Sequence, residues 1–461
     1  MDLELLLFYK NPLFHTILSL ILAFTLSFFN LPLFFLYALQ TYIHPDSQPQ
    51  SNATRAAIRR PSSTATDGPE IKRRNTKSKD KASDFDENNA QIFRLRLDQS
   101  HLRSRLYIDH YCVAFTVSFV TLCSLLLHKY LDSGKNRGFL ESGVFVPILL
   151  SSLSLYMWVM LFVRVTFERS ASRRSEKQFS AVFGVLGFLF GLLVLVPDLL
   201  VFLDFDFVPV DGFWRFFVAS LIGCFSGFMF IPAGRGARSF WLGTDQIRCN
   251  LSMITCGWFT RLILYANQIL VIFVALLWIK PLAEIFVNTN NHRSSKGASV
   301  INSGLGNGNA DKLVGNMGLL PSEFSNFRQW CLLGSSLLQI LALRPNLQMY
   351  LNEALLSWYQ RLHASKVPDL DYSRAKMFLH NHFLCLVVLQ FLGPPMLVLL
   401  FLGLSQIDGP SFGNFPLSNL LPSFAFINQV ALFLAWWVCF LWALFSSVIL
   451  TLHRHCILYV S

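Results

Sequence analysis

Residues 178–197 read QFSAVFGVLGFLFGLLVLVP, a run of twenty residues without a charge. At a rise of about 1.5 Å per residue, a helix of this length spans about 30 Å, which matches the hydrocarbon core of a bilayer. Four bases precede the run and four acids follow it: Arg169, Arg173, Arg174 and Lys177, then Asp198, Asp204, Asp206 and Asp211. Because Lys and Arg are retained in the cytosol, the stretch predicts a membrane crossing and also its direction.

The composition of the whole chain is typical of a membrane protein. Of its 461 residues, 53% are hydrophobic and 14% are charged, whereas a soluble domain carries about 25% charged residues. The net charge is +11, but the bases gather at the ends of apolar runs, where topology and anionic headgroups account for them. We therefore expect the lipid bilayer as a partner, and no nucleic acid.

Nine apolar runs are candidates for membrane crossings. They lie near residues 13–31, 109–130, 142–163, 179–203, 213–232, 262–282, 328–344, 377–403 and 424–450. Helices are the expected form, because a helix satisfies its backbone hydrogen bonds within one segment. The predicted fold is therefore an all-α, polytopic transmembrane helical bundle with about nine spans, within a range of eight to ten.

The charges of the loops predict the side of the membrane on which each loop lies. With nine spans, the clearly basic loops all fall on one side: 44–108, 164–178, 233–261 and 345–376. The positive-inside rule then places the N-terminus outside and the C-terminus in the cytosol, in an endomembrane or in the plasma membrane. In the alternative, the first run is a cleaved signal, eight spans remain and residues 44–108 lie outside.

The chain divides into three parts. Residues 1–43 are an N-terminal membrane anchor, residues 44–108 a basic and largely disordered cytosolic segment, and residues 109–461 the transmembrane helical bundle. The middle part is too charged and too poor in large apolar side chains to build a core. Within the bundle, residues 283–327 are rich in Ser, Gly and Asn, and we expect a flexible loop there.

One of the basic loops contains the pattern of an amphipathic helix. Apolar residues recur three or four positions apart: Leu347, Tyr350, Leu351, Ala354, Leu355, Trp358 and Leu362. Polar residues take the other face of the helix. Trp and Tyr suit the depth of the headgroups, so the pattern predicts a cytosolic amphipathic helix that lies in the membrane interface.

Two neighbouring spans carry glycines four positions apart, Gly187 with Gly191 and Gly223 with Gly227. The missing side chains allow two helices to approach closely. We expect this packing to occur within one chain, and a homodimer face is the alternative.

The polar side chains inside the spans are mostly amides. The candidates for a polar path are Asn267, Gln268, Gln339 and Gln390, together with Pro394. Pro394 and Pro395 each lack a backbone donor, so we expect them to break their helix and to free carbonyl groups near Gln390. Hydrogen bonding between helices is one explanation for the amides, and a polar path for an ion or solute is the alternative.

No motif in the sequence indicates catalysis or a bound metal. The pairs His380 with His382 and His453 with His455 are two positions apart, so their side chains diverge on a helix. The cysteines include no CxxC spacing, and the motifs of serine hydrolases, zinc proteases and nucleotide-binding loops are missing. We therefore expect no enzyme activity, catalytic residue, metal or cofactor.

Short motifs follow one another in a characteristic order along the chain. They are Phe216 through Pro232 and Arg235; Leu277-Trp278-Ile279-Lys280-Pro281; Arg344 followed by Leu347 to Ala354, which includes Gln348, Tyr350 and Asn352; Trp436-Trp437; and His44-Pro45. In their order and loop placement, these motifs resemble the transmembrane protein 161 family. The resemblance implies a multipass eukaryotic membrane protein without an assigned enzymatic activity. Animal members are linked to membrane excitability and ion currents, which is an association and not a mechanism.

The sequence leaves two functions open. The first is a non-enzymatic multipass membrane protein that modulates ion-channel or signalling machinery through contacts with a membrane-protein partner. The amphipathic helix, the basic segment and the lack of a buried acid or histidine relay favour it. The alternative is a channel or carrier, with a path lined by the buried Asn and Gln side chains near the Pro394-Pro395 helix break.

Overall fold

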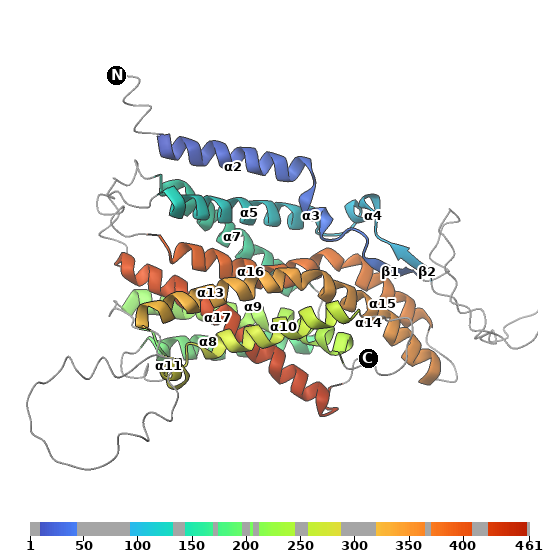
Figure 1. Cartoon of the computed structure of the whole chain (residues 1–461). Coiled ribbons are helices and arrows are strands. Elements are labelled where there is room, and N and C mark those ends of the chain that lie inside the picture. Colours follow the sequence, from blue (N-terminus) through green and yellow to red (C-terminus); the bar gives the residue numbers. More distant parts are fainter. Residues whose placement is uncertain are drawn as a thin grey trace, which may run out of the picture.

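A computed structural model gives the structure of the protein and describes residues 10–43, 93–131, 143–168, 174–195, 203–205, 212–244, 257–286, 320–364, 370–407 and 423–458. Within these ranges the chain is a bundle of long helices with one short pair of strands, which confirms the predicted all-α fold class (Figure 1). The central parts of two predicted flexible regions, residues 44–92 and 287–319, lie outside the described ranges.

The elements follow the chain in a simple order. The N-terminal elements are α2 (Lys10–Phe28), α3 (Leu31–Phe34), β1 (Gln40–Ile43), β2 (Phe93–Arg96), α4 (Gln99–Arg103), α5 (Ile108–Leu131), α7 (Phe145–Phe167) and α8 (Arg174–Val194). The remaining elements are α9 (Gly212–Thr244), α10 (Trp258–Leu276), α11 (Lys280–Phe286), α13 (Pro321–Leu341), α14 (Leu343–Ala364), α15 (Leu370–His382), α16 (Leu384–Leu404) and α17 (Phe424–Arg454).

Each of the nine predicted spans coincides with one long helix. Eight of these helices, namely α2, α5, α7, α8, α9, α10, α16 and α17, are long and apolar enough to cross a membrane. The ninth, α13, is less apolar, but it packs against α10 and α16 inside the bundle. Its buried positions include Ser335, Ser336 and Gln339, so its polar side chains face protein rather than lipid. The structure therefore agrees with the predicted range of eight to ten spans.

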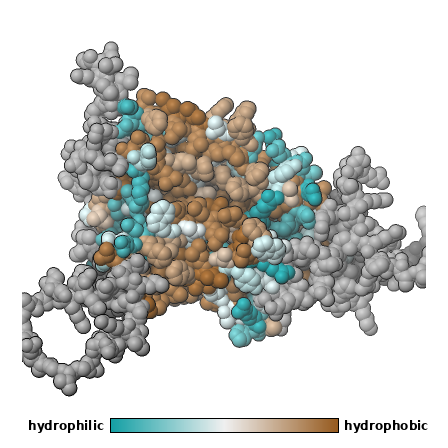
Figure 2. Space-filling view, viewed as in Figure 1, coloured by the Kyte–Doolittle hydropathy of each residue, from teal (hydrophilic) through white to brown (hydrophobic). Residues whose placement is uncertain are grey.

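The centre of the bundle is α16, and every residue from Leu384 to Leu402 is buried. Its sequence carries no charge on any side, as expected for a helix that is surrounded by other helices. By contrast, few residues of α2, α8 and α10 are fully buried. Figure 2 shows the resulting surface, an apolar zone that lies between hydrophilic residues at the two ends of the bundle.

The prediction that Pro394 and Pro395 break their helix is wrong. Both prolines lie inside α16, which continues without interruption through them. The missing donors leave the carbonyl groups of Gln390 and Phe391 without their usual intrahelical partners, while packing on all sides holds the helix together. At Gly393 a Cβ atom would lie 2.4 Å from the ring of Phe162, so the glycine allows α7 to pack directly against α16.

The helix α9 is longer than the predicted span 213–232. It continues through Pro232 as far as Thr244. The extension is rich in small residues, and at Gly236 a Cβ atom would lie 2.8 Å from the ring of Trp442 on α17. Close packing of this kind compensates for the backbone hydrogen bond that Pro232 cannot donate. As a result, residues that the sequence places in a basic loop lie inside the bundle.

Two other predictions change at the same end of the bundle. The predicted amphipathic helix forms as α14, but its polar residues Asn352 and Glu353 are also buried, so protein covers its polar face as well. The segment 44–108 was expected to be largely disordered, yet its described part contains β2 and α4. The strands β1 and β2 pair in antiparallel register, from Gln40 with Arg96 to Ile43 with Phe93.

Candidate functional site

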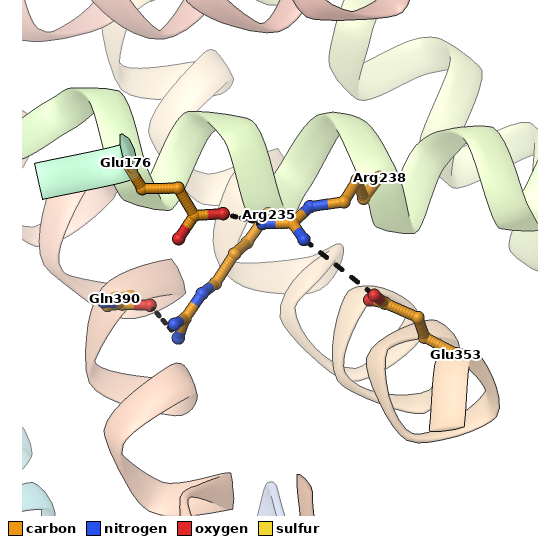
Figure 3. A network of polar contacts seen from close by, with 5 residues as sticks. All are labelled: Glu176, Arg235, Arg238, Glu353 and Gln390. Carbon is orange, nitrogen blue, oxygen red and sulfur yellow. Dashed lines mark hydrogen bonds and ion pairs between the residues drawn. The ribbon is translucent and has the colours of Figure 1, made fainter. Parts of the chain in front are cut away.

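A network of charged and polar side chains joins four helices at one end of the bundle (Figure 3). Its members are Glu176 of α8, Arg235 and Arg238 of α9, Glu353 of α14 and Gln390 of α16. We call this the polar network, and the end of the bundle that holds it the network end. Charges inside a membrane protein are costly unless they are paired, so such a cluster is the first place to look for function.

The contact at the centre of the polar network is a hydrogen bond between α9 and α16. A guanidinium nitrogen of Arg235, Nη1, donates to Oε1 of Gln390 at 2.5 Å. Arg235 is 8% exposed and Gln390 is 1% exposed. A charged donor makes a stronger bond than a neutral one, and a buried guanidinium that lost its acceptor would be strongly destabilising. The bond therefore fixes α9 against the central helix.

The second arginine connects two carboxylates on different helices. Nη2 of Arg238 lies 2.9 Å from Oε1 of Glu176, and Nη1 lies 3.9 Å from Oε1 of Glu353. Only the first distance is a hydrogen bond, and the second is a longer ion pair. Arg235 and Arg238 are three positions apart on α9, so both point into the same part of the bundle.

Ionisable groups of α14 and α15 respond to this environment. Burial alone raises the pKa of the Glu353 carboxyl, but Arg238 and other basic groups nearby lower it more, so the net pKa lies below its ordinary value. Burial lowers the pKa of His380, whose ring stacks on Tyr350 at 4.7 Å between centroids. Burial also raises the pKa of the Tyr350 hydroxyl to about 12. At neutral pH Glu353 is therefore ionised, and the neighbouring Tyr350 is neutral.

A ladder of amides and hydroxyls continues the polar contacts from α14 to β1. Gln348 accepts a hydrogen bond from the backbone nitrogen of Gln40 at 3.0 Å and donates to its carbonyl oxygen at 3.0 Å. Oδ1 of Asn352 accepts from the hydroxyl of Tyr42 and from Nε2 of Gln348, both at 3.1 Å. The side chain of Asn381 donates to the carbonyl of Tyr42 at 2.8 Å. Gln348 thus pairs with β1 on the side away from β2.

The amides predicted to line a polar path have separate partners. Nε2 of Gln268 donates to the hydroxyl of Ser446 at 2.9 Å, whereas Gln390 accepts from Arg235. Asn267 and Gln339 are both buried, and Oδ1 of Asn267 has no hydrogen-bond partner. Pro394 lies in the core of α16. No contact between described residues joins these side chains into one continuous row.

The four predicted packing glycines meet along one line between α8 and α9. A Cβ atom at Gly187 would lie 2.1 Å from the hydroxyl oxygen of Ser226, and one at Gly223 would lie 2.9 Å from the carbonyl oxygen of Gly184. Gly191 packs against Ala219, and Gly227 packs against Ser180 and Gly184. The interface thus lies within one chain, and we call it the glycine seam.

At the other end of the bundle, the family-motif residue Trp278 is the centre of an aromatic cluster. Its ring stacks on Phe205 at 6.0 Å, and the guanidinium of Arg328 lies 5.3 Å from its centroid. Arg328 also forms an ion pair with Asp204. Trp436 lies 5.5 Å from Phe205 and donates its indole N–H to the carbonyl of Ala275. We call this the aromatic end.

The other members of the predicted motifs have different surroundings. Trp437 stacks on Phe190 at 5.0 Å and donates to the carbonyl of Ile222 at 3.4 Å. Lys280 and Pro281 are exposed at the start of α11. Arg344 is exposed and donates to the carbonyl of Tyr37 at 3.2 Å. The family-motif residues therefore lie at both ends of the bundle and do not gather in one site.

Three network residues, Glu176, Arg238 and Glu353, were not predicted as site residues from the sequence. The signal that could have found Arg238 is the run of small residues after Pro232, which is typical of a helix that packs closely against others. On α14, Asn352 and Glu353 follow Gln348 by one helical turn, which indicates a polar face that meets other polar groups. No group of three His, Cys, Asp or Glu side chains in the described ranges is arranged to hold a metal ion.

Comparison with known proteins agrees with the motif analysis. A family model described as predicted transmembrane protein 161AB matches residues 203–416. No curated protein and no solved structure matches the chain. The matched region contains α9, α10, α13, α14 and α16, and with them Arg235, Glu353 and Gln390. The match agrees with the family indicated by the sequence motifs: over residues 203–416 the chain is similar to the transmembrane protein 161 family, and its long apolar helices make it a multipass membrane protein.

Proposed function

We propose that this protein is a non-enzymatic membrane protein that modulates ion-channel or signalling machinery through contacts with a membrane-protein partner. The observation that carries the proposal is the closed centre of the bundle. Side chains fill the space around α16 along its whole apolar length, and the polar network joins α16 to its neighbours at one end. A bundle with a filled centre is suited to binding a partner protein on its outer surface. It is less suited to moving a solute along its centre.

The proposed orientation in the membrane rests on the distribution of Lys and Arg among the loops. We propose that the network end faces the cytosol, with the N-terminus outside and the C-terminus inside. The basic loops of the sequence lie on this side when nine helices cross the bundle. A direct test is the sequon Asn52-Ala-Thr54. We expect no glycan at Asn52, and a loss of mass on treatment with an amidase that removes N-glycans would place the segment outside.

The partner proposal is tested by proximity labelling in native membranes. A biotin ligase fused to the C-terminus should label a small, reproducible set of membrane proteins above the background of an unrelated multipass protein with the same fusion. Chemical cross-linking and co-purification should then recover at least one of them with the full-length chain. A labelling pattern identical to that of the unrelated protein would count against a specific partner.

A channel or carrier is the second candidate, and one observation favours it. Oδ1 of Asn267 is buried without a hydrogen-bond partner. Asn267 lies on α10 next to Gln268, another residue of the predicted polar path. Buried polar atoms without a partner are rare, and an ion or a water molecule is one explanation. Purified protein in liposomes should then conduct ions or move a solute, and Asn267→Leu should abolish this activity. If the purified protein moves nothing, the partner proposal is favoured.

A further inference from the structure

A pocket of about 400 Å³ opens at the network end, next to the polar network but separate from it. Its walls come from β1 and the residues before it, from the first turns of α10 and from the junction between α13 and α14. The volume falls within the range of about 300–1,000 Å³ that is usual for small-ligand sites. Arg344, Gln348 and Asn352 line it, and these are family-motif residues without a role in the polar network.

The polar wall of the pocket is rich in donors. Arg344 carries the only formal charge among the described lining residues, none of which is a carboxylate. Asn352 is 4% exposed, and both of its hydrogen bonds are to Oδ1. Its amide nitrogen, which can only donate, therefore remains available for the pocket. The hydroxyl of Thr260 adds a third donor.

The start of α10 adds to the positive character of this wall. The helix begins at Trp258 after Gly257, which has no side chain to cap the free N–H groups. Phe259 and Thr260 of this first turn line the pocket. The N-terminal end of a 19-residue helix carries a partial positive charge and binds anions. The pocket therefore combines the cation of Arg344, the amide donor of Asn352, the hydroxyl of Thr260 and the N-terminal end of α10. Together these groups favour the binding of an anion such as phosphate.

The pocket also has apolar lining residues, and it lies at the boundary of the membrane. These residues are Phe259, Ile263, Leu341 and Met349. α10 is one of the candidate spans and begins here, so the pocket opens at the depth where headgroups lie. At the start of this helix, Trp258 is 78% exposed and the lining residue Phe259 is 60% exposed, which suits aromatic side chains at a membrane interface. A ligand with an anionic head and an apolar tail matches both kinds of lining residue.

We propose that this pocket binds the phosphate headgroup of an anionic phospholipid. The phosphate lies against Arg344, Asn352 and the first turn of α10, while the glycerol and the upper acyl carbons lie along the apolar lining residues. The inference does not depend on the proposed partner, because it concerns a different set of residues and a direct binding measurement. Anionic lipids are abundant in the cytosolic leaflet, on the side where the network end is proposed to lie.

The test uses the purified full-length protein in detergent micelles and a fluorescent short-chain phosphatidic acid as the probe, because this lipid offers little besides the phosphate. We expect saturable binding that unlabelled phosphatidic acid displaces and that phosphatidylcholine displaces poorly. Arg344→Gln should weaken binding about tenfold or more, since it removes the charge that pairs with the phosphate. Arg454→Gln removes a base in the last turn of α17, outside the pocket, and should bind the probe as the wild type does.

Asn352→Asp is the second variant and keeps the shape of the side chain. The carboxylate still accepts from Tyr42 and Gln348, but it replaces the donor by a negative oxygen, so probe binding should fall by about tenfold or more. Unchanged binding by both pocket variants would overturn the proposal, as would equal displacement by phosphatidylcholine. If inorganic phosphate displaces the probe as well as phosphatidic acid does, the lipid is the wrong assignment and a soluble phosphate is the ligand.

Discussion

The two ends of the bundle are held together by different kinds of contact. At the network end, Arg235, Arg238, Glu353 and Gln390 connect the helices through charge and directional hydrogen bonds. At the aromatic end, the cluster around Trp278 relies on ring packing, and the ion pair of Arg328 lies against its rings. Charge-based contacts depend on pH and on exact geometry, whereas ring packing depends on volume. The two ends should therefore respond differently to the same kind of perturbation.

The largest effect is expected at the aromatic end. Trp278→Ala removes a side chain that is 2% exposed, and with it the contacts to Phe205 and Arg328. The cavity and the lost burial should cost about 3–5 kcal/mol in the free energy of unfolding. Thermal unfolding of the purified protein in detergent measures this. Trp258→Ala, at an indole that is 78% exposed, is the control and should have little effect. Equal stability of the two variants would contradict the aromatic cluster as a stabilising element.

The next effect is expected at the network end. Gln390→Leu keeps most of the side-chain volume but removes the charge-assisted hydrogen bond between Gln390 and the buried guanidinium of Arg235, which should cost about 1.5–3 kcal/mol. The double variant Arg235→Leu with Gln390→Leu should recover part of this loss, because it removes both members of the buried polar pair. Gln268→Leu, which removes a partly buried bond to Ser446, is the matched control and should cost less. A double variant that is less stable than Gln390→Leu alone would argue against the pairing.

A third perturbation tests the glycine seam, the interface between α8 and α9. α8 carries Glu176 at the network end and Phe190, which stacks on Trp437, farther along the helix. Gly223→Ala places a Cβ atom 2.9 Å from the carbonyl of Gly184, so α8 and α9 must separate, at a cost of about 1–3 kcal/mol. Gly334→Ala is the same substitution on α13, where a Cβ atom meets nothing within 4 Å. It should be neutral or slightly stabilising, because Ala favours a helix.

The smallest effect is a dependence on pH at the network end. Glu353 has a lowered pKa, so its contribution to stability is present above the unfolded value of 4.5 and is lost as the pH falls through the folded value. His380 also has a lowered pKa, so its contribution is complete above 6.5 and is lost as the pH falls below that value. Both signs predict a melting temperature that decreases on acidification. The effect is small, since Arg238 and Glu353 are 3.9 Å apart and Arg238 also binds Glu176.

Two variants separate the contributions to this pH dependence. Glu353→Gln should flatten the decrease below pH 4.5, and His380→Gln should flatten the decrease that begins near pH 6.5. Trp278→Ala should lower the melting temperature at every pH and leave the slope unchanged. A slope that changes in Trp278→Ala but not in Glu353→Gln or His380→Gln would contradict the assignment of the pH dependence to the network end.

The sequence predicts the spans well because lipid contact selects long uncharged runs, such as the one from Gln178 to Pro197. It predicts the ends of helices less well. Pro232, followed by arginines, indicates the end of a span, yet α9 continues for twelve residues to Thr244 because small residues allow it to pack against α17. The continuity of α16 through Pro394 has the same origin. In both places tertiary packing, which the local sequence does not encode, outweighs the preference of proline.

The sites depend on contacts between distant parts of the chain. Arg235 and Gln390 are 155 positions apart, and Gln40 and Gln348 are 308 positions apart. The motif analysis singled out Arg235, Gln348 and Asn352, but it could not show that the first faces α16 or that the other two line a pocket. Glu353 belongs to the helix that the sequence predicts to lie in the membrane interface, and only the structure places it against Arg238.

The pairing of β1 with β2 has a practical consequence for anyone who wishes to label this protein. The register joins Ile43 to Phe93, so the backbone enters and leaves the intervening stretch at neighbouring points, about 5 Å apart. A fluorescent protein whose own termini are close together could therefore be inserted between residues 44 and 92 without pulling the two strands apart. Such an insertion would leave both natural termini free and would carry its reporter at the end of the bundle where Arg344 and the headgroup pocket lie.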